Sequence, residues 1–356
     1  MIKRKTSKHR AGKVSMIILI IIALLAAAVF GAWNLLRNSG YRNLYDKWRG
    51  KAPTLNIGQL EEGESIDIGW QDGWIRYENK VYAYNENIIT CFIMGTDKDD
   101  QMLEESSGFS GGQSDANFLL VLNPDKQIIQ IVCINRDTMT DIAICDVLGN
   151  YTGTIKGQLA TQHAYGKSTY ENAENTVKAV ENIMYGLPIH CYCAVKMDAI
   201  GEINDAVGGV TVKCLEDLTR VNWRFTVGNE VKLQGKQAYD YVHYRDIKVF
   251  ESARGRLARQ KQYLSGFIGQ AKAAMKKNPT IAVSLFNSLT NYMTTDLSVD
   301  EVAYLASTAA GYKFDTSDIY TLEGTTRQGD IYEEFYPDEE ALQQLIIELF
   351  YEEVQQ

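Results

Sequence analysis

The sequence predicts an α/β fold in which helices flank both faces of a mixed central sheet, giving α-β-α layers, preceded by a transmembrane helix and a small accessory region. Three observations support this fold class. Short apolar runs rich in Val and Ile alternate with segments whose apolar residues recur at helical spacing. A long apolar run follows a basic amino terminus. A polar, Trp-containing stretch separates that run from the first expected strand of the sheet.

The amino-terminal segment predicts a membrane anchor. Six basic residues precede an apolar run from Met16 to Trp33, which is long enough to cross a hydrocarbon core of roughly 30 Å. Because basic flanks stay in the cytoplasm, we expect a cytoplasmic tail over 1–15 and a transmembrane helix over 16–36. The remainder would lie outside the cell, held at the cell membrane by this single pass. A cleaved signal peptide is the alternative, since Ala26-Ala27-Ala28 offers small residues at a cleavage site.

Residues 37–86 predict an extracellular accessory or stalk region. The stretch around Glu78-Asn79 alternates on both sides as a hairpin does, and three tryptophans favour a packed unit over a simple stalk. The chain carries a net charge of −9 although its first fifteen residues are basic. Binding along a polyphosphate backbone needs a basic surface, so we expect no nucleic-acid partner.

Residues 87–356 predict one large domain, because no Pro/Ser-rich linker divides them. We expect its sheet strands at 88–95, 118–123, 127–135 and 190–197, with a turn at 123–126. We expect its helices at 171–186, 198–207, 252–277, 298–311 and 338–353. The helix 252–277 carries Leu257, Leu264 and Phe267 on one apolar face.

The six cysteines show no zinc-site spacing. Those at 91, 133, 191 and 193 lie in apolar strand-like runs, which favours buried free thiols over disulfides.

Charged residues follow or precede three of the expected strands. Asp97 follows the first, Asp115 comes just before the second, and Arg136-Asp137 follows the third. Loops at strand ends are where α/β sheets hold ligands, and paired carboxylates suit Mg²⁺, with Mn²⁺ as an alternative, when phosphate oxygens complete the shell. Taken singly, the aspartates also fit turn or cap residues, and Arg136-Asp137 fits a local ion pair.

A second concentration of charge lies where the helix 252–277 begins. Its members are Arg245, Arg254, Arg256, Arg259 and Gln260. Guanidinium forks hold phosphate groups in a fixed orientation, and a helix amino terminus attracts anions. The cluster therefore indicates a phosphate or pyrophosphate site, with a solvated helix face as the alternative.

In their order along the chain, these segments resemble the LytR-CpsA-Psr family of Gram-positive bacteria. The resemblance is carried by MGTDKDD (94–100), SDANFLLVLNPDKQIIQIVCINRDTMTDI (114–142), QLATQHAYG (158–166), the stretch 174–212 and YVHYRDIKVFESARGRLARQ (241–260). It implies a phosphotransferase that moves a glycopolymer phosphate, such as teichoic acid or capsule, from a polyprenyl pyrophosphate carrier to a peptidoglycan sugar hydroxyl. It also implies that 87–356 is the catalytic domain.

The resemblance also implies roles for individual residues. Asp97 and Asp115 match the family's magnesium-linked carboxylates. Arg136, Arg245, Arg256 and Gln260 match positions that hold the pyrophosphate, and Arg259 lies beside them. We therefore expect Arg136, Asp137, Arg245 and Arg256 to be catalytic. The face formed by Leu257, Leu264 and Phe267 is expected to bind the isoprenoid tail.

The chain departs from the family pattern at three positions. Asn135 replaces the usual Pro, His243 replaces the first arginine of an Arg-x-Arg pair, and Ala253 replaces an Asp that is a candidate base. Glu251 or Asp137 could substitute for that base, although a loose transition state needs little base. His163, in the matched segment 158–166, is interpreted as a structural histidine. These departures leave two alternative functions open, a non-catalytic lipid-binding regulator and a lipid pyrophosphatase.

Overall fold

The computed structural model describes residues 31–44, 52–57, 70–97, 112–146, 148–246, 249, 252–330 and 332–354. The predicted tail 1–15 and most of the predicted transmembrane helix 16–36 lie outside these ranges. Residues 31–44 are helical. Within the described ranges, none of the helices combines the length and the apolar character needed to span a bilayer.

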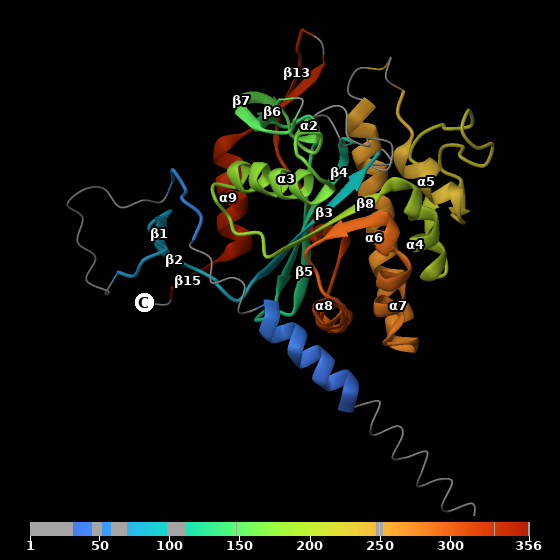
Figure 1. The fold of residues 1–356 in the computed structure, drawn as a ribbon, viewed down its shortest axis with the longest axis horizontal. Helices are drawn as coiled ribbons and strands as arrows, with labels where there is room; N and C mark the ends of the chain where they lie inside the picture. Colours follow the sequence, from blue (N-terminus) through green and yellow to red (C-terminus); the bar gives the residue numbers. More distant parts are fainter. Residues whose placement is uncertain are drawn as a thin grey trace, which may run out of the picture.

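A six-stranded mixed sheet forms the centre of the molecule (Figure 1). In spatial order its strands are β11 (Met293–Thr295), β8 (Cys191–Lys196), β3 (Ile89–Thr96), β4 (Ser114–Asn123), β5 (Ile128–Ile134) and β12 (Ile319–Thr321). The β3–β8 and β5–β12 pairs are parallel, and the other neighbours are antiparallel. The predicted mixed sheet is therefore confirmed.

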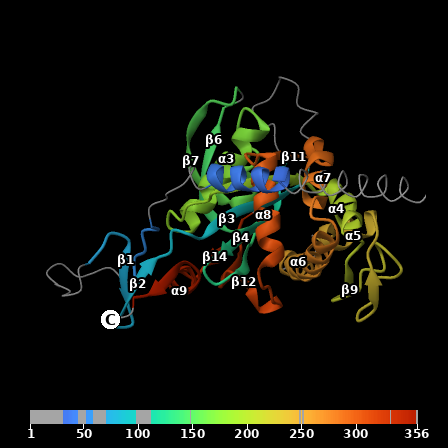
Figure 2. The same cartoon turned by 90° about the horizontal axis from the view of Figure 1, so that it is seen from below.

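Helices cover both faces of this sheet. Alternate strand residues such as Phe92 and Met94 share one apolar core with α3 (Thr169–Ile183) and α9 (Glu339–Phe350). Strand residues of the opposite face share another core with α6 (Ser252–Lys277) and α8 (Val299–Gly311). Figure 2 shows the sheet between these helices. Period-two alternation along buried strands produces the layers that the sequence predicts.

A smaller group of elements packs beside α6 around a third apolar core. It contains η2 (Met197–Ala199), α4 (Ile200–Ala206), β9 (Thr211–Lys213), β10 (Glu230–Lys232) and α5 (Lys236–His243). Gly208 and Gly209 both have positive φ, and a Cβ at Gly209 would meet the carbonyl oxygen of Leu233 at 2.8 Å. The close approach of this Gly-Gly pair to the end of β10 therefore leaves no room for a side chain at Gly209.

The accessory region contains the predicted hairpin. Strands β1 (Trp74–Tyr77) and β2 (Lys80–Tyr84) pair across Glu78 and Asn79, both of which have positive φ as a type I′ turn requires. Strand β2 also pairs with β15 (Tyr351–Glu353), which follows α9. The accessory hairpin is thus joined to the last described strand of the chain.

Several elements are not foreseen from the sequence. These are β6 (Met139–Cys145), β7 (Tyr151–Gln158), α2 (Leu159–Gln162), α7 (Ile281–Ser288), η3 (Thr290–Tyr292), η4 (Thr316–Asp318), β13 (Gly324–Gln328) and β14 (Glu333–Pro337), together with β10, α5, β11, β12 and β15. Most of these strands are short or largely exposed, so they lack the apolar alternation that identifies the central ones. All six cysteines are free. Cys91, Cys133 and Cys191 are buried thiols, as expected, whereas Cys193 is only partly buried.

Candidate active site

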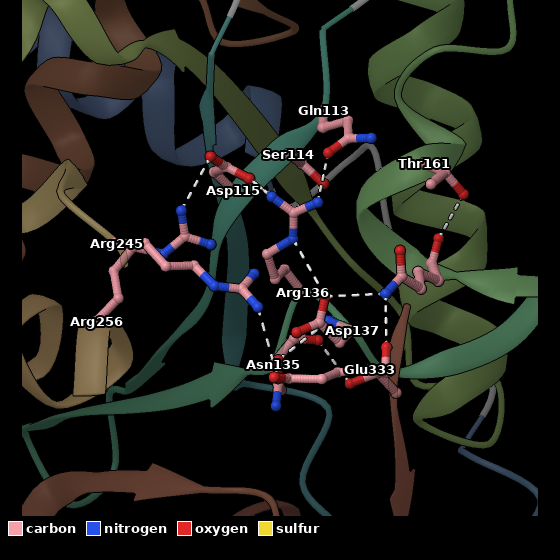
Figure 3. A network of polar contacts seen from close by, with 12 residues as sticks. Gln113, Ser114, Asp115, Asn135, Arg136, Asp137, Thr161, Arg245, Arg256 and Glu333 are labelled. Atoms are coloured by element: carbon pink, nitrogen blue, oxygen red, sulfur yellow. Dashed lines mark hydrogen bonds and ion pairs between the residues drawn. The ribbon is translucent and has the colours of Figure 1, made fainter. Parts of the chain in front are cut away.

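Charged residues from separate parts of the chain meet at one edge of the central sheet (Figure 3). Strands β3 and β5 end at this edge, and the antiparallel strand β4 begins there. Asp97 follows β3, Asp115 is the second residue of β4, and Arg136-Asp137 follows β5. The predicted convergence of these strand ends is therefore present in the structure.

Asp115 lies between two arginines. Its side chain is 7% exposed, and its Oδ2 accepts a hydrogen bond of 3.1 Å from Nη1 of Arg256. Its Oδ1 forms an ion pair with Nη1 of Arg136. One carboxylate thus holds the end of β5 and the second turn of α6 together.

Further polar groups fix the guanidinium of Arg136. Its Nη2 donates to Oε1 of Gln113, and its Nε lies 3.3 Å from Oδ1 of Asp137. Asp137 is buried, and its Oδ1 also accepts from Nε2 of Gln158 at 3.0 Å. Asp137 therefore orients Arg136.

Arg245 brings a third guanidinium to the same place. Its Nε donates to Oγ of Ser252 at 2.9 Å, and its Nη2 lies 3.5 Å from a carboxylate oxygen of Glu333. Gln158 donates to the backbone carbonyl of Glu333, which ties β14 to the site. Sequence reasoning missed Gln113, Gln158, Ser252 and Glu333. Gln158 and Ser252 lie within the matched segments 158–166 and 241–260, but no local pattern in the sequence marks their contacts with the site.

The three guanidinium groups are crowded. The pKa of Arg136 is lowered to about 10, chiefly by burial and in addition by the charges of Arg256 and Arg245, against the opposing effect of Asp137. Burial, followed by repulsion from Arg245, lowers the pKa of Arg256 to about 10. An anion placed among these groups would offset that repulsion, which favours an anionic ligand at this site.

Arg259 does not join this group. Its Nε donates to Glu216 at 2.6 Å, and its two Nη atoms donate to the backbone carbonyls of Tyr241 and Tyr244. With only 2% of its surface exposed, this guanidinium is committed to protein partners. Its predicted role in pyrophosphate binding stays a prediction, and the contacts favour a structural role.

An apolar cavity of about 190 Å³ adjoins the charged site. Gln260 and Ala116 line it, and these residues lie next to Arg256 and Asp115 along α6 and β4. Leu264 and Phe267 also line it, as expected for a lipid-binding face. Leu257 does not line the cavity. It lies two turns before Leu264 on the same side of α6 and packs in the core between α6 and the sheet.

The carboxylates fit a magnesium ion only together with ligand oxygens. Asp97 is exposed and accepts a 2.8 Å hydrogen bond from the backbone N–H of Gln113, near Asp115. Within the described ranges, no three His, Cys, Asp or Glu side chains converge on one point. Mg²⁺ is commonly held by one or two carboxylates plus phosphate oxygens. Asp97 has an exposed carboxylate for such a role, whereas both carboxylate oxygens of Asp115 contact arginines.

The positions that depart from the family pattern lie close to this site. His243 stacks on Tyr239 with ring centroids 4.6 Å apart, and its pKa is lowered first by burial and then by the charge of Arg256. Ala253 is buried in the first turn of α6, and Glu251 lies outside the described residues. His163 is buried with Nδ1 3.1 Å from the carbonyl of Gly112, and burial lowers its pKa to about 4. These contacts fit the structural role expected for it.

A layered α/β domain with buried arginines beside an apolar cavity is suited to a ligand that has an anionic head and an apolar tail. The chain belongs to the LytR_cpsA_psr family, whose model matches residues 71–350. The family resemblance seen in the sequence is therefore confirmed.

Known relatives are similar over most of the chain. One is a polyisoprenyl-teichoic acid–peptidoglycan teichoic acid transferase, TagU of Oceanobacillus iheyensis, with 27% identity over 250 residues, covering 69% of each protein. TagU of Bacillus subtilis is 26% identical over 345 residues, covering 96% of this chain and 97% of its own length. The expected enzyme class, a transferase, is supported by these relatives.

Solved structures match the fold. The crystal structure of B. subtilis TagV superposes with a TM-score of 0.56 at 23% identity, covering 74% of this chain and 96% of that one. This likeness confirms the layered α/β architecture.

Proposed function

We propose that this protein is a phosphotransferase that moves a glycopolymer phosphate from a polyprenyl pyrophosphate carrier to a sugar hydroxyl of peptidoglycan and releases polyprenyl phosphate. The observation that carries this proposal is the contact between two unlike surfaces. Arg136 and Arg256 both contact Asp115, Arg245 lies close enough to Arg256 to repel it, and the apolar cavity begins at Ala116 and Gln260 on the same strand and helix. A polyprenyl pyrophosphate is a ligand with both characters.

In this proposal Arg136, Arg245 and Arg256 bind the pyrophosphate oxygens. Phosphoryl transfer passes through a loose transition state, so positioning and charge neutralisation supply most of the rate. The guanidinium groups are already held by Asp115, Asp137 and Glu333, and little reorganisation is needed when the ligand arrives. Leu264 and Phe267 would contact the first isoprene units.

A magnesium ion would be held by Asp97 and Asp115 together with pyrophosphate oxygens. Bound there, it would neutralise charge that develops on the leaving phosphate. Asp115 would then have two tasks, because the same carboxylate also orients Arg136 and Arg256. Mn²⁺ has similar oxygen preferences and is the alternative ion.

Asp137 is one candidate for the base that would accept the proton of the acceptor hydroxyl. Oδ1 of Asp137 already interacts with Arg136 and Gln158, which suits an orienting residue better than a proton acceptor. We therefore propose that the reaction depends on charge neutralisation more than on a dedicated base.

We also propose that residues 16–36 anchor the protein in the cell membrane with its catalytic domain, 87–356, on the outer side. A lipid-linked donor stays at the bilayer surface, so a tethered enzyme meets it at high effective concentration. Residues 37–86 would then be the accessory region next to the membrane.

The test is to incubate the protein with a short-chain polyprenyl pyrophosphate saccharide, peptidoglycan oligomers and Mg²⁺, and to identify the products by mass spectrometry. We expect a saccharide phosphate on the oligomer and free polyprenyl phosphate. Saccharide phosphate released into water would support the pyrophosphatase. Tight lipid binding without any product would support the regulator, and the replacement of two family residues by His243 and Ala253 would then explain the loss of chemistry.

A further inference from the structure

A closed loop between β9 and β10, residues 214–229, displays apolar side chains to solvent. Trp223 is 82% exposed, Val227 63% and Leu215 49%. The only charged residues from 218 to 229 are Arg220 and Arg224, on a chain whose net charge is −9. The outer part of this loop is therefore both apolar and basic.

The exposure of Trp223 is built into the fold. The backbone N–H of Leu218 donates to the carbonyl of Phe225, and that of Gly228 donates to the carbonyl of Cys214, both at 2.8 Å. Leu218 and Phe225 are buried, and Phe225 packs edge-on against Tyr241 at 5.4 Å between ring centroids. The loop thus buries two apolar residues and holds Trp223 outward.

The loop adjoins the proposed active site. Glu216 binds Arg259 of α6 at 2.6 Å. Leu218 and Phe225 belong to the same apolar core as Val242 and Phe267, which line the apolar cavity. A second cavity, of about 500 Å³, lies between the loop residue Arg220 and Arg245 of the arginine cluster. The loop therefore borders the space for both the tail and the head of the proposed donor.

We propose that loop 214–229 rests on the surface of an anionic lipid bilayer, with Trp223 and Val227 in the interface and Arg220 and Arg224 on lipid phosphates. Tryptophan concentrates at bilayer interfaces because its ring is amphipathic, and arginine beside it adds attraction to anionic headgroups. The outer part of the loop, 218–229, carries two arginines and no acidic residue, while Glu216 and Asp217 lie at its base. This outer part provides the positive charge that an anionic membrane attracts. The inference rests on the proposed function in one respect, since a lipid-linked donor must enter from the bilayer.

The first experiment measures how deep Trp223 lies. The full chain is placed in vesicles of phosphatidylcholine and phosphatidylglycerol with brominated acyl chains, and its tryptophan emission is compared with that of the variant Trp223→Phe. The difference between the two emissions is the emission of Trp223. We expect brominated lipid to quench this emission and aqueous acrylamide not to reach it. Quenching by acrylamide with none by lipid would overturn the proposal and would favour a protein or glycan partner.

The second experiment tests the arginines. We expect Arg220→Gln with Arg224→Gln to weaken membrane engagement of the loop by roughly fivefold per charge removed, read as a fall in lipid quenching of Trp223. Arg327→Gln removes one positive charge from β13, where the guanidinium stacks on Tyr336. It is the control for either single arginine variant of the loop and should change nothing. Equal losses in both variants would contradict a specific role for the loop.

These measurements need no catalysis, which separates the two proposals. A chain that transfers saccharide phosphate while Trp223 stays in water retains the proposed function and loses this inference. A chain whose Trp223 enters the bilayer without any transfer retains the inference and loses the function.

Discussion

Two arginines on α6, three positions apart, have opposite surroundings. Arg256 shares Asp115 with Arg136 and is repelled by Arg245, so its environment is short of negative charge. Arg259 donates to one carboxylate and two backbone carbonyls, so its environment is complete. Both are buried, and sequence spacing cannot distinguish them. What separates a ligand-binding guanidinium from a structural one is the balance of the acceptors around it.

The largest effect predicted from this comparison is that of Arg256→Ala. We expect transfer to fall by about a thousandfold, because a buried cation aimed at the transferring phosphate is lost. The free energy of unfolding should stay close to that of the parent protein, since Asp115 keeps Arg136 and a repulsion disappears. Product formation and thermal unfolding measure the two effects. Normal transfer by this variant would count heavily against the assignment.

Arg259→Ala is the matched change. It leaves two carbonyls and Glu216 without their donor, and we expect a loss of about 2–4 kcal/mol in the free energy of unfolding. Urea unfolding followed by circular dichroism checks this. A variant that keeps full stability but loses binding of the pyrophosphate lipid would move Arg259 into the ligand site.

A buried neutral histidine makes the free energy of unfolding depend on pH. His190 has a pKa lowered to about 4 by burial, and its Nδ1 accepts from the backbone N–H of Thr90. The unfolded chain, with a histidine pKa near 6.5, binds the proton first as pH falls. Stability should therefore drop between about pH 6.5 and 4, by about 3 kcal/mol from this residue. Unfolding titrations across that range should show a flatter profile for His190→Gln, and an unchanged slope would refute the argument.

Two apolar residues of α6 give the smallest effect. Leu257→Ala should cost about 1–2 kcal/mol of stability, because the residue packs between α6 and the sheet, and should leave lipid preference unchanged. Phe267→Ser should instead raise the KM for long-chain donors several-fold relative to short ones, because Phe267 lines the cavity. If both variants raised the KM for long-chain donors to the same extent, the distinction between Leu257 as a core residue and Phe267 as a cavity residue would be wrong.

The central strands and main helices could be predicted because burial imposes a period on them. The alternation of apolar residues in β3, β4 and β5 and their helical spacing in α3 and α6 can be read directly from the sequence. Asp97, Asp115 and Arg136 were predictable because they lie where apolar runs stop. Glu333 and Gln158 were not, because their role comes from the contact of β14 with the site, and no local pattern marks a long-range contact.

The surroundings of Arg259 and Leu257 likewise could not be predicted from the sequence. Both satisfy the local rule that singled them out, a basic cluster and an apolar helical face. Their environments depend on where the loop after β9 and the sheet lie in three dimensions. The predicted anchor and tail, and Glu251, fall outside the described residues and stay predictions.

The pairing of β2 with β15 has a consequence for the order of assembly. Tyr84 pairs with Tyr351, so the hairpin of β1 and β2 gains its third strand only after the chain has been synthesised as far as β15. Contacts between such distant positions carry a large loop-closure cost and form late. We therefore expect the sheet of β1, β2 and β15 to form late in folding, after the central sheet whose strands lie between its two halves in the sequence.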